Sequence, residues 1–458
     1  MDSRDGLTGL LRGSAAAGLR RDLNALDFTL LVLGAEIGAD VYIVASLGAG
    51  YLGPAQMAAW AVAGVMAALI VLAFMQCAVI YPEVGGTYAY VRHAYGSLAG
   101  FTAGWSLYLG EVVLLPVFPT AFLNYVTYFV PGLGEPARLS IIVGLVACVT
   151  VVNIVGVRAS GRLNDVLTLA KLIPLLVLIG AGIATAVARP GLVSQRLEPF
   201  APLGWGGFGP AVILIFLAYA GFELAVLPAS EIQEPRKTMP RGLLTAVSIC
   251  TLVYLLTTFA TTVAVPWQDA ARSSHPLADA LDSLTRELGW AGLPSGVLMS
   301  LGGLVSISAA FDVYTLSVAR LSYAMAADGF LPRPFAWVSP RFGTPVVALV
   351  VQGIFGIAAG RVLELSRLID AGMFLIGLCY AATSLAAIRL VSRHPDQSLR
   401  VPALRVLLAL GGAAGLYLAL QAPVGLKLTG LAVVGLGVGL YCARAAVVRI
   451  IRVGQARR

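Results

Sequence analysis

Two carboxylates, Glu36 and Asp40, lie in the middle of an apolar stretch that is long enough to cross a lipid bilayer. The stretch covers residues 28–50 and reads FTLLVLGAEIGADVYIVASLGAG. A charged side chain at the centre of a membrane helix costs ~2.5 to 3.5 kcal/mol, so such residues usually mark an ion or substrate path. The neighbouring Gly34 and Gly38 weaken the helix on both sides, and a broken helix is tolerated at this depth only where it lines a cavity enclosed by protein. We interpret the stretch as a helix interrupted to form a binding site.

A second stretch, from Phe216 to Gly242, repeats the combination of glycine and carboxylate. Its sequence is FLAYAGFELAVLPASEIQEPRKTMPRG, with Gly221 and Glu223 at mid-depth and Pro228 after them. Two broken helices in corresponding positions are typical of transporters built from inverted repeats. Each break exposes N–H groups on one side and carbonyl groups on the other, which can hold the carboxylate and the ammonium of an amino acid. The alternative, that the glycines only allow helices to pack closely, explains one span more easily than both.

The composition indicates a membrane protein with many spans. Of the 458 residues, 59% are hydrophobic, 12% are charged and 51 are glycine, and the mean hydropathy is +0.87. Residues 1–27 are polar and mixed in charge, so no signal peptide is expected there. A spanning helix needs ~20 apolar residues. Stretches near this length predict twelve transmembrane helices, at residues 28–50, 56–80, 98–130, 139–157, 162–186, 208–230, 241–265, 293–325, 345–361, 368–391, 402–422 and 427–447.

The charged residues between the spans predict the orientation. If the N-terminus is cytoplasmic, most of the arginines and lysines fall in cytoplasmic segments, so both termini are expected on the inside of the cytoplasmic membrane. This distribution also accounts for the net charge of +8, and no nucleic-acid partner is expected. The five cysteines have no CxxC spacing and the three histidines form no metal-binding pattern. Neither an HExxH nor a GxSxG motif is present. We therefore expect no enzyme activity, no metal and no cofactor.

Several motifs resemble those of the amino acid-polyamine-organocation superfamily. They are LGPA at Leu52–Ala55, PEVGGTYAYVRHAYG at Pro82–Gly96, the AYAGFE block with its EIQEPRKTMPRG tail, and SVARLSYAMAADGFLP at Ser317–Pro332. The resemblance covers residues 25 to 445 approximately. It implies an all-α fold of the LeuT type, in which two repeats of five helices are inverted relative to each other and the central site is reached alternately from either side. It also implies a division of the chain, namely a cytoplasmic N-terminal segment (1–27), a transport core (28–391, with repeats 28–186 and 208–391), two additional helices (402–447) and a basic cytoplasmic tail (448–458).

The first break departs from the superfamily pattern. Members commonly have IGSGIF or IGAGIF there, whereas this chain has Glu36 and Asp40. Carboxylates beside the amides that would hold a substrate carboxylate repel it unless they are protonated or neutralised. Other acids in the third, sixth and eighth spans would also approach the centre in this fold. The residues expected to bind substrate are Glu36, Ile37, Gly38, Ala39, Asp40, Glu111, Leu217, Ala218, Tyr219, Ala220, Gly221, Glu223, Asp312 and Tyr314.

Lys171 is a further charge at membrane depth. It lies about two and a half turns into the fifth span, too deep for its ammonium to reach the cytoplasmic interface easily. The sequence around Lys171 resembles that of proton-coupled, sodium-independent members of the superfamily, in which a lysine at this position fills the space of a sodium ion. The resemblance implies contacts with the backbone near Gly34–Gly38 and with Ser306 or Ser308, and a role in proton coupling for Lys171, Glu223, Ser306 and Ser308. A purely structural tether to the first helix is the alternative.

The predicted function is that of a proton-coupled secondary transporter for amino acids or related organic amines in the lipid bilayer. The acidic centre favours cationic substrates such as basic amino acids or polyamines. Symport of neutral amino acids is one alternative. A second is an inorganic-cation permease, because EIGADVY resembles the DIGTSPLY stretch of potassium-uptake permeases in the same superfamily.

Overall fold

The computed structural model describes residues 24–82, 85–155, 161–226, 232–290, 292–362 and 364–456. Within these ranges the regular structure is helical, as predicted. Most of the predicted segment 1–27, together with Pro228 and the last two residues of the basic tail, lies outside the described residues. The division into two inverted repeats stays a prediction.

The helices follow the predicted spans closely. The spanning and associated helices of the first half are α2 (Ala25–Glu36), α3 (Ala39–Leu52), η1 (Gly53–Ala55), α4 (Gln56–Ile80), α5 (Gly86–Tyr95), α6 (Ser97–Leu114), α7 (Val117–Phe129), α8 (Glu135–Val155), α9 (Gly161–Ala188) and α10 (Pro190–Leu197). Those of the second half are α11 (Phe208–Phe216), η2 (Leu217–Tyr219), α12 (Phe222–Ala225), α13 (Pro235–Ala264), α14 (Trp267–Arg272), α15 (Pro276–Glu287), α16 (Ser295–Ala327), η4 (Arg333–Ala336), α17 (Val346–Val362), α18 (Leu365–Arg393), η5 (Pro395–Gln397), α19 (Leu404–Gln421) and α20 (Val424–Ala456).

The lengths and compositions of these helices fit a polytopic membrane protein. Among the described residues, nine stretches are long and apolar enough to cross a membrane. One of them, Ala39–Ile80, joins α3 and α4, which belong to two different predicted spans. Two shorter apolar helices, Phe208–Leu224 and Val346–Arg361, occupy the sixth and ninth predicted spans. Each predicted span therefore corresponds to one helix or to two or three consecutive helical segments.

Local sequence explains where several helices begin and break. The side chain of Asn24 accepts hydrogen bonds from the N–H groups of Leu26 and Asp27, and Asp27 accepts one from the N–H of Asn24. This capping box starts α2 three residues before the predicted span. The third span, predicted as one helix, is divided between α6 and α7 at Pro116, because proline has no N–H to continue the ladder and its ring crowds the preceding turn.

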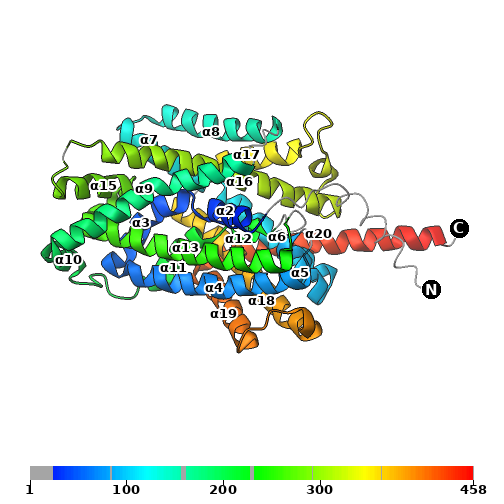
Figure 1. Cartoon of the computed structure of the whole chain (residues 1–458). Helices are drawn as coiled ribbons and strands as arrows, with labels where there is room; N and C mark the ends of the chain where they lie inside the picture. Colours follow the sequence, from blue (N-terminus) through cyan, green and yellow to red (C-terminus); the bar gives the residue numbers. More distant parts are fainter. Residues whose placement is uncertain are drawn as a thin grey trace.

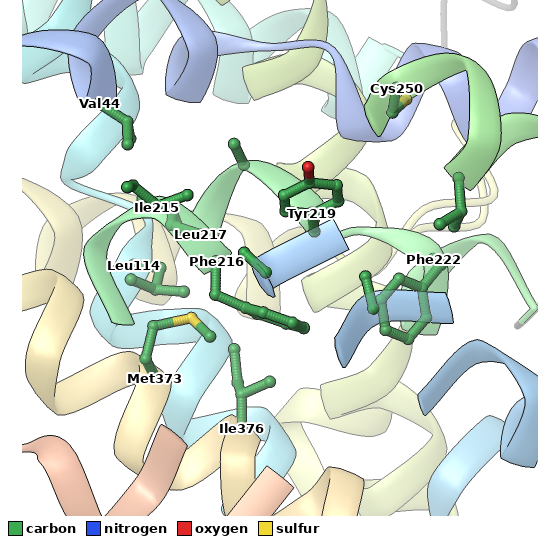
Figure 2. Close-up of a cluster of buried hydrophobic side chains, with 14 of the residues drawn as sticks. Val44, Leu114, Ile215, Phe216, Leu217, Tyr219, Phe222, Cys250, Met373 and Ile376 are labelled. Carbon is green, nitrogen blue, oxygen red and sulfur yellow. The ribbon is translucent and has the colours of Figure 1, made fainter. Parts of the chain in front are cut away.

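The interrupted helices lie in the middle of the bundle. Figure 1 shows α2, α3, α11 and α12 between α8 and α17 on one side and α4, α18 and α19 on the other, while α20 extends beyond the remaining helices. Apolar and aromatic side chains pack around the sixth span. Figure 2 shows Phe216, Tyr219 and Phe222 of this span near residues of α6 and α18. The rings of Phe216 and Phe222 lie 5.9 and 5.3 Å from that of Tyr380 on α18. This packing fixes the interrupted helix against its neighbours.

Gly221 gives a test of how closely the two interrupted helices approach. Its φ is +126°, and a Cβ at this position would lie 3.1 Å from the carbonyl oxygen of Ala35 on α2. Gly221→Ala should lower the free energy of unfolding by about 1–3 kcal/mol, because it adds backbone strain and a contact with α2. Thermal unfolding of the purified protein in detergent measures the change.

Gly289→Ala is the matched control for backbone strain alone. Gly289 also has a positive φ, of +80°, but a Cβ there would meet no atom within 4 Å. The control should therefore cost less than Gly221→Ala. Equal losses in the two variants would contradict a close approach of the sixth span to α2.

Candidate functional site

The first break consists of two residues between α2 and α3. Ile37 donates its N–H to the carbonyl of Leu33 at 2.9 Å, which closes the last turn of α2. Gly38 follows with φ −132° and ψ −138°, outside any helix. A Cβ at Gly38 would lie 2.8 Å from the Cβ of Ala310, so glycine lets α16 approach the break. The break between α2 and α3 thus lies directly against α16.

The second break lies in the sixth span, as predicted. The helix α11 tightens into η2, Ala220 is extended with φ −71° and ψ 150°, and α12 begins after Gly221. The N–H of Gly221 lies 3.0 Å from each carboxylate oxygen of Glu223. Glu223 is 1% exposed, so its charge faces an amide at the start of α12, where a helix stabilises an anion. This contact occupies one of the amides that the break exposes.

Lys171 on α9 contacts the first interrupted helix, as the resemblance implied. Its Nζ donates to the carbonyl of Gly34 at 2.6 Å, and the side chain is 4% exposed. Of the two serines expected nearby, Ser306 faces the break, with its Oγ 3.5 Å from the carbonyl of Ile37. Ser308 instead donates to Leu304 of its own helix. The lysine and one serine therefore supply donors to carbonyls near the end of α2.

Glu36 and Asp40 are both buried at the break but differ in their surroundings. Glu36 is the last residue of α2, and neither of its carboxylate oxygens has a nitrogen or oxygen hydrogen-bond partner among the described residues. The thiol of Cys250 on α13 is close enough to interact with this carboxyl group. Asp40 is the second residue of α3, with 5% exposure, and its Oδ2 lies 3.7 Å from the place that a Cβ of Gly38 would take. The start of a helix favours a negative charge and the end opposes it. The charge of Asp40 is therefore supported by α3, whereas that of Glu36 has no such support.

Tyr254 on α13 joins the two breaks, and no motif in the sequence pointed to it. Its hydroxyl lies 3.0 Å from the carbonyl of Glu36 and 2.8 Å from that of Ala218, and the residue is fully buried. Both carbonyls belong to helix ends beside a break. A single tyrosine in the apolar run ICTLVYLLTT carries no spacing signal, so only the packing of α13 against the breaks identifies it.

A second group of acids lies deeper in the bundle. Glu111 on α6 is fully buried, and one of its carboxylate oxygens accepts a hydrogen bond from the hydroxyl of Tyr314 on α16. The same hydroxyl lies 3.2 Å from the carbonyl of Glu111. The carboxyl groups of Glu111 and Glu223 are close enough to interact. Glu111, Glu223 and Tyr314 are thus brought together from three helices, as the predicted site requires.

Asp312 does not join this group, which corrects its predicted position. Its Oδ1 accepts a hydrogen bond from the Nδ2 of Asn153 on α8 at 2.7 Å. Two residues along an α-helix turn the side chain by about 200°, so Asp312 and Tyr314 face nearly opposite sides of α16. Since Tyr314 contacts Glu111, the carboxylate of Asp312 faces α8 instead of the centre.

The remaining predicted residues of the sixth span are buried around the break. Leu217, Ala218 and Tyr219 are at most 5% exposed, and Figure 2 shows Leu217 and Tyr219 on this segment. The hydroxyl of Tyr219 donates to the carbonyl of Trp60 on α4 at 3.1 Å, so it is held by the neighbouring scaffold. In the part of the chain that the structure describes, no three histidine, cysteine or acidic side chains gather as metal ligands.

Comparison with known proteins identifies the family to which this arrangement belongs. The family model for amino acid permeases matches residues 23–434. The chain belongs to the amino acid permease family. This family is part of the amino acid-polyamine-organocation superfamily, in agreement with the motifs described above. The proteins to which the chain is similar are transporters, not enzymes.

Three relatives illustrate the range of names within this permease family. The branched-chain amino acid permease BcaP of Bacillus subtilis is 27% identical over 403 residues, which cover 84% of this chain and 83% of the relative. The methylthioribose transporter of Bacillus subtilis is 28% identical over 412 residues, or 85% and 86% of the two chains. The cationic amino acid transporter 4 of Mus musculus is 28% identical over 410 residues, or 85% of this chain and 63% of the relative.

The contact between Glu111 and Tyr314 can be tested by a double-mutant cycle. Tyr314→Phe removes the donor to a buried carboxyl group and should lower the free energy of unfolding by about 1–3 kcal/mol. In a Glu111→Gln background the same change should cost less, because the carboxylate is no longer left without its donor. Thermal unfolding of the four proteins gives the coupling energy. Additive effects would show that the two side chains do not interact in the folded permease.

Proposed function

We propose that this permease is a proton-coupled secondary transporter of amino acids or related organic amines, with a preference for cationic substrates. It would act in the cytoplasmic membrane with both termini in the cytoplasm, and the central site would open alternately to the two sides. The proposal rests on one observation above all, the carboxyl group of Glu36. It is fully buried beside the first break and has no nitrogen or oxygen hydrogen-bond partner among the described residues, with only the weakly polar thiol of Cys250 close enough to interact.

The balance of donors and acceptors supports a cationic ligand. The acceptors near the breaks include the carbonyls of Gly34, Glu36 and Ala218 and the carboxyl groups of Glu36 and Asp40. The side-chain donors that contact these carbonyls are Lys171 and Tyr254. Buried acceptors without donors are costly. A ligand that carries an ammonium or guanidinium group brings several donors and a positive charge, so it relieves both deficits.

A substrate carboxylate is less well accommodated at the same place. The amides that begin α3 would attract it, but Asp40 already occupies this end of the helix with its own carboxylate. The name of the mouse relative, a cationic amino acid transporter, agrees with the preference for cations. The name of BcaP, a branched-chain amino acid permease, supports the second candidate, symport of neutral amino acids. In that case the positive charge of Lys171 would offset the negative charge of Glu36 or Asp40.

Proton coupling is supported by the position of Lys171. Its ammonium lies 2.6 Å from the carbonyl of Gly34, so a sodium ion at this carbonyl would face a positive charge. A lysine amine can release and regain a proton within a transport cycle, because burial and nearby acids act on it in opposite directions. The exchange of this proton would change the link between α9 and α2.

The charge preference predicts how ligand binding responds to two carboxamide variants. Glu36→Gln and Asp40→Asn keep the shape of each side chain and remove its charge. A charge-assisted contact contributes ~1.5 to 3 kcal/mol, so each variant should bind cationic amines roughly ten- to a hundredfold more weakly. Binding of zwitterionic leucine should stay level or improve. A thermal-shift screen of the purified protein against arginine, lysine, putrescine, spermidine, leucine and alkali cations measures these affinities, since a ligand stabilises the state that it binds.

Asp312→Asn is the matched control for this screen. It removes a carboxylate charge from the same membrane region, but its side chain lies against Asn153 on α8. The ratio of cationic to zwitterionic affinity should therefore match that of the parent. Loss of both ligand classes to the same extent in Glu36→Gln and Asp40→Asn would contradict a cation site. Stabilisation by potassium without competition from amines would favour an inorganic-cation permease instead.

The coupling role of Lys171 predicts a flux phenotype. In liposomes, uptake by the parent should respond to an imposed proton gradient and should not change when choline replaces sodium. Lys171→Ala should remain folded but lose nearly all accumulation driven by the proton gradient, because it removes the titratable group at Gly34. Lys427→Ala is the control, since the Nζ of Lys427 also donates to a backbone carbonyl, that of Leu420, but lies at an exposed site. Full proton-driven accumulation in Lys171→Ala would disprove the coupling role and leave a structural tether.

A further inference from the structure

Tyr254 lies between two backbone carbonyls beside the proposed substrate site, one in the first span and one in the sixth. Its hydroxyl oxygen is 3.0 Å from the carbonyl of Glu36 and 2.8 Å from the carbonyl of Ala218. Both partners are acceptors. A tyrosine hydroxyl carries one proton, so it can make one full hydrogen bond to this pair at a time. The other carbonyl is then left with an unfilled acceptor position in a buried place.

The ring of Tyr254 keeps the hydroxyl at this point. Its centroid lies 5.2 Å from that of Trp60 on α4 and 5.2 Å from that of Tyr219 in η2. Tyr219 is itself tied to the carbonyl of Trp60. All three residues are fully buried. The aromatic group therefore holds the hydroxyl against the two carbonyls even when a ligand competes for them.

We propose that Tyr254 is a specificity-determining residue, because it supplies one proton to two carbonyls and leaves one carbonyl of this pair to accept a hydrogen bond from the ammonium of the substrate. This inference rests on the proposed function, since it requires a substrate with an ammonium group. The two acceptors are the backbone carbonyls of Glu36 and Ala218. The hydroxyl of Tyr254 then sets how many of these two carbonyls need an N–H donor from the ligand.

Tyr254→Phe tests the inference, because it removes the hydroxyl and keeps the ring packing. The probes are leucine and lysine, each with no, one, two or three methyl groups on the α-nitrogen. Successive methyl groups remove N–H donors and keep the positive charge. Affinities are measured by thermal shift or by calorimetry on the purified full chain. The relevant quantity is the affinity ratio between the unmethylated and the trimethylated probe, because steric effects of the methyl groups are common to both proteins.

The ratio should rise about five- to tenfold in Tyr254→Phe, since both carbonyls then need a donor from the ligand. Tyr125→Phe is the matched control. Tyr125 is also fully buried, and its hydroxyl donates to one backbone carbonyl, that of Tyr42 in α3, at 3.0 Å. Its variant should leave the ratio unchanged. An unchanged or lower ratio in Tyr254→Phe would overturn the inference and leave Tyr254 a structural role.

If the parent binds neither unmethylated probe, the proposed function itself fails, and with it the role of Tyr254. This outcome is distinct from binding with an unchanged ratio.

Discussion

A carbonyl that is freed by a helix break in the membrane needs a hydrogen-bond donor, and the lipid supplies none. The arrangement around the centre of this permease depends on that constraint. The carbonyls near the breaks receive donors from three other helices, with Lys171 on α9, Tyr254 on α13 and Ser306 on α16. These helices must therefore pack against the interrupted spans. The need to satisfy the backbone thus determines which helices surround the site.

The same breaks give the central acids different environments. Asp40 and Glu223 lie at helix starts, where amides favour a negative charge. Glu111 accepts a hydrogen bond from the hydroxyl of Tyr314. Glu36 lies at the end of α2, where carbonyls oppose a negative charge, and its oxygens have no nitrogen or oxygen hydrogen-bond partner among the described residues. An apolar residue in this position would stabilise the folded protein more than an acid does. The presence of the acid is best explained by a ligand or a proton that binds there.

The sequence predicted the spans and the two breaks, because each depends on local composition or on depth in the membrane. The contact between Lys171 and the backbone of α2 was implied by the family resemblance, since depth alone indicates only that the lysine needs a partner. It could not predict the direction in which a side chain on a long buried helix points. Asp312 and Tyr314 both seemed central by depth, yet the helical turn allows only one to face Glu111. Ser306 and Ser308 are separated in the same way. Tyr254 escaped prediction because its role depends on two carbonyls from distant parts of the chain.

The relatives place a limit on what the fold alone determines. Proteins named for branched-chain amino acids, for methylthioribose and for cationic amino acids match most of this chain at 27–28% identity. Substrate choice in such a family must come from side chains and from the number of free backbone donors and acceptors, because the backbone plan is shared. In this chain Glu36 and Asp40 place acidic side chains at the first break, where the motifs IGSGIF and IGAGIF of the superfamily have none. The proposed preference for a ligand with donors and positive charge therefore depends on these side chains, not on the shared backbone plan.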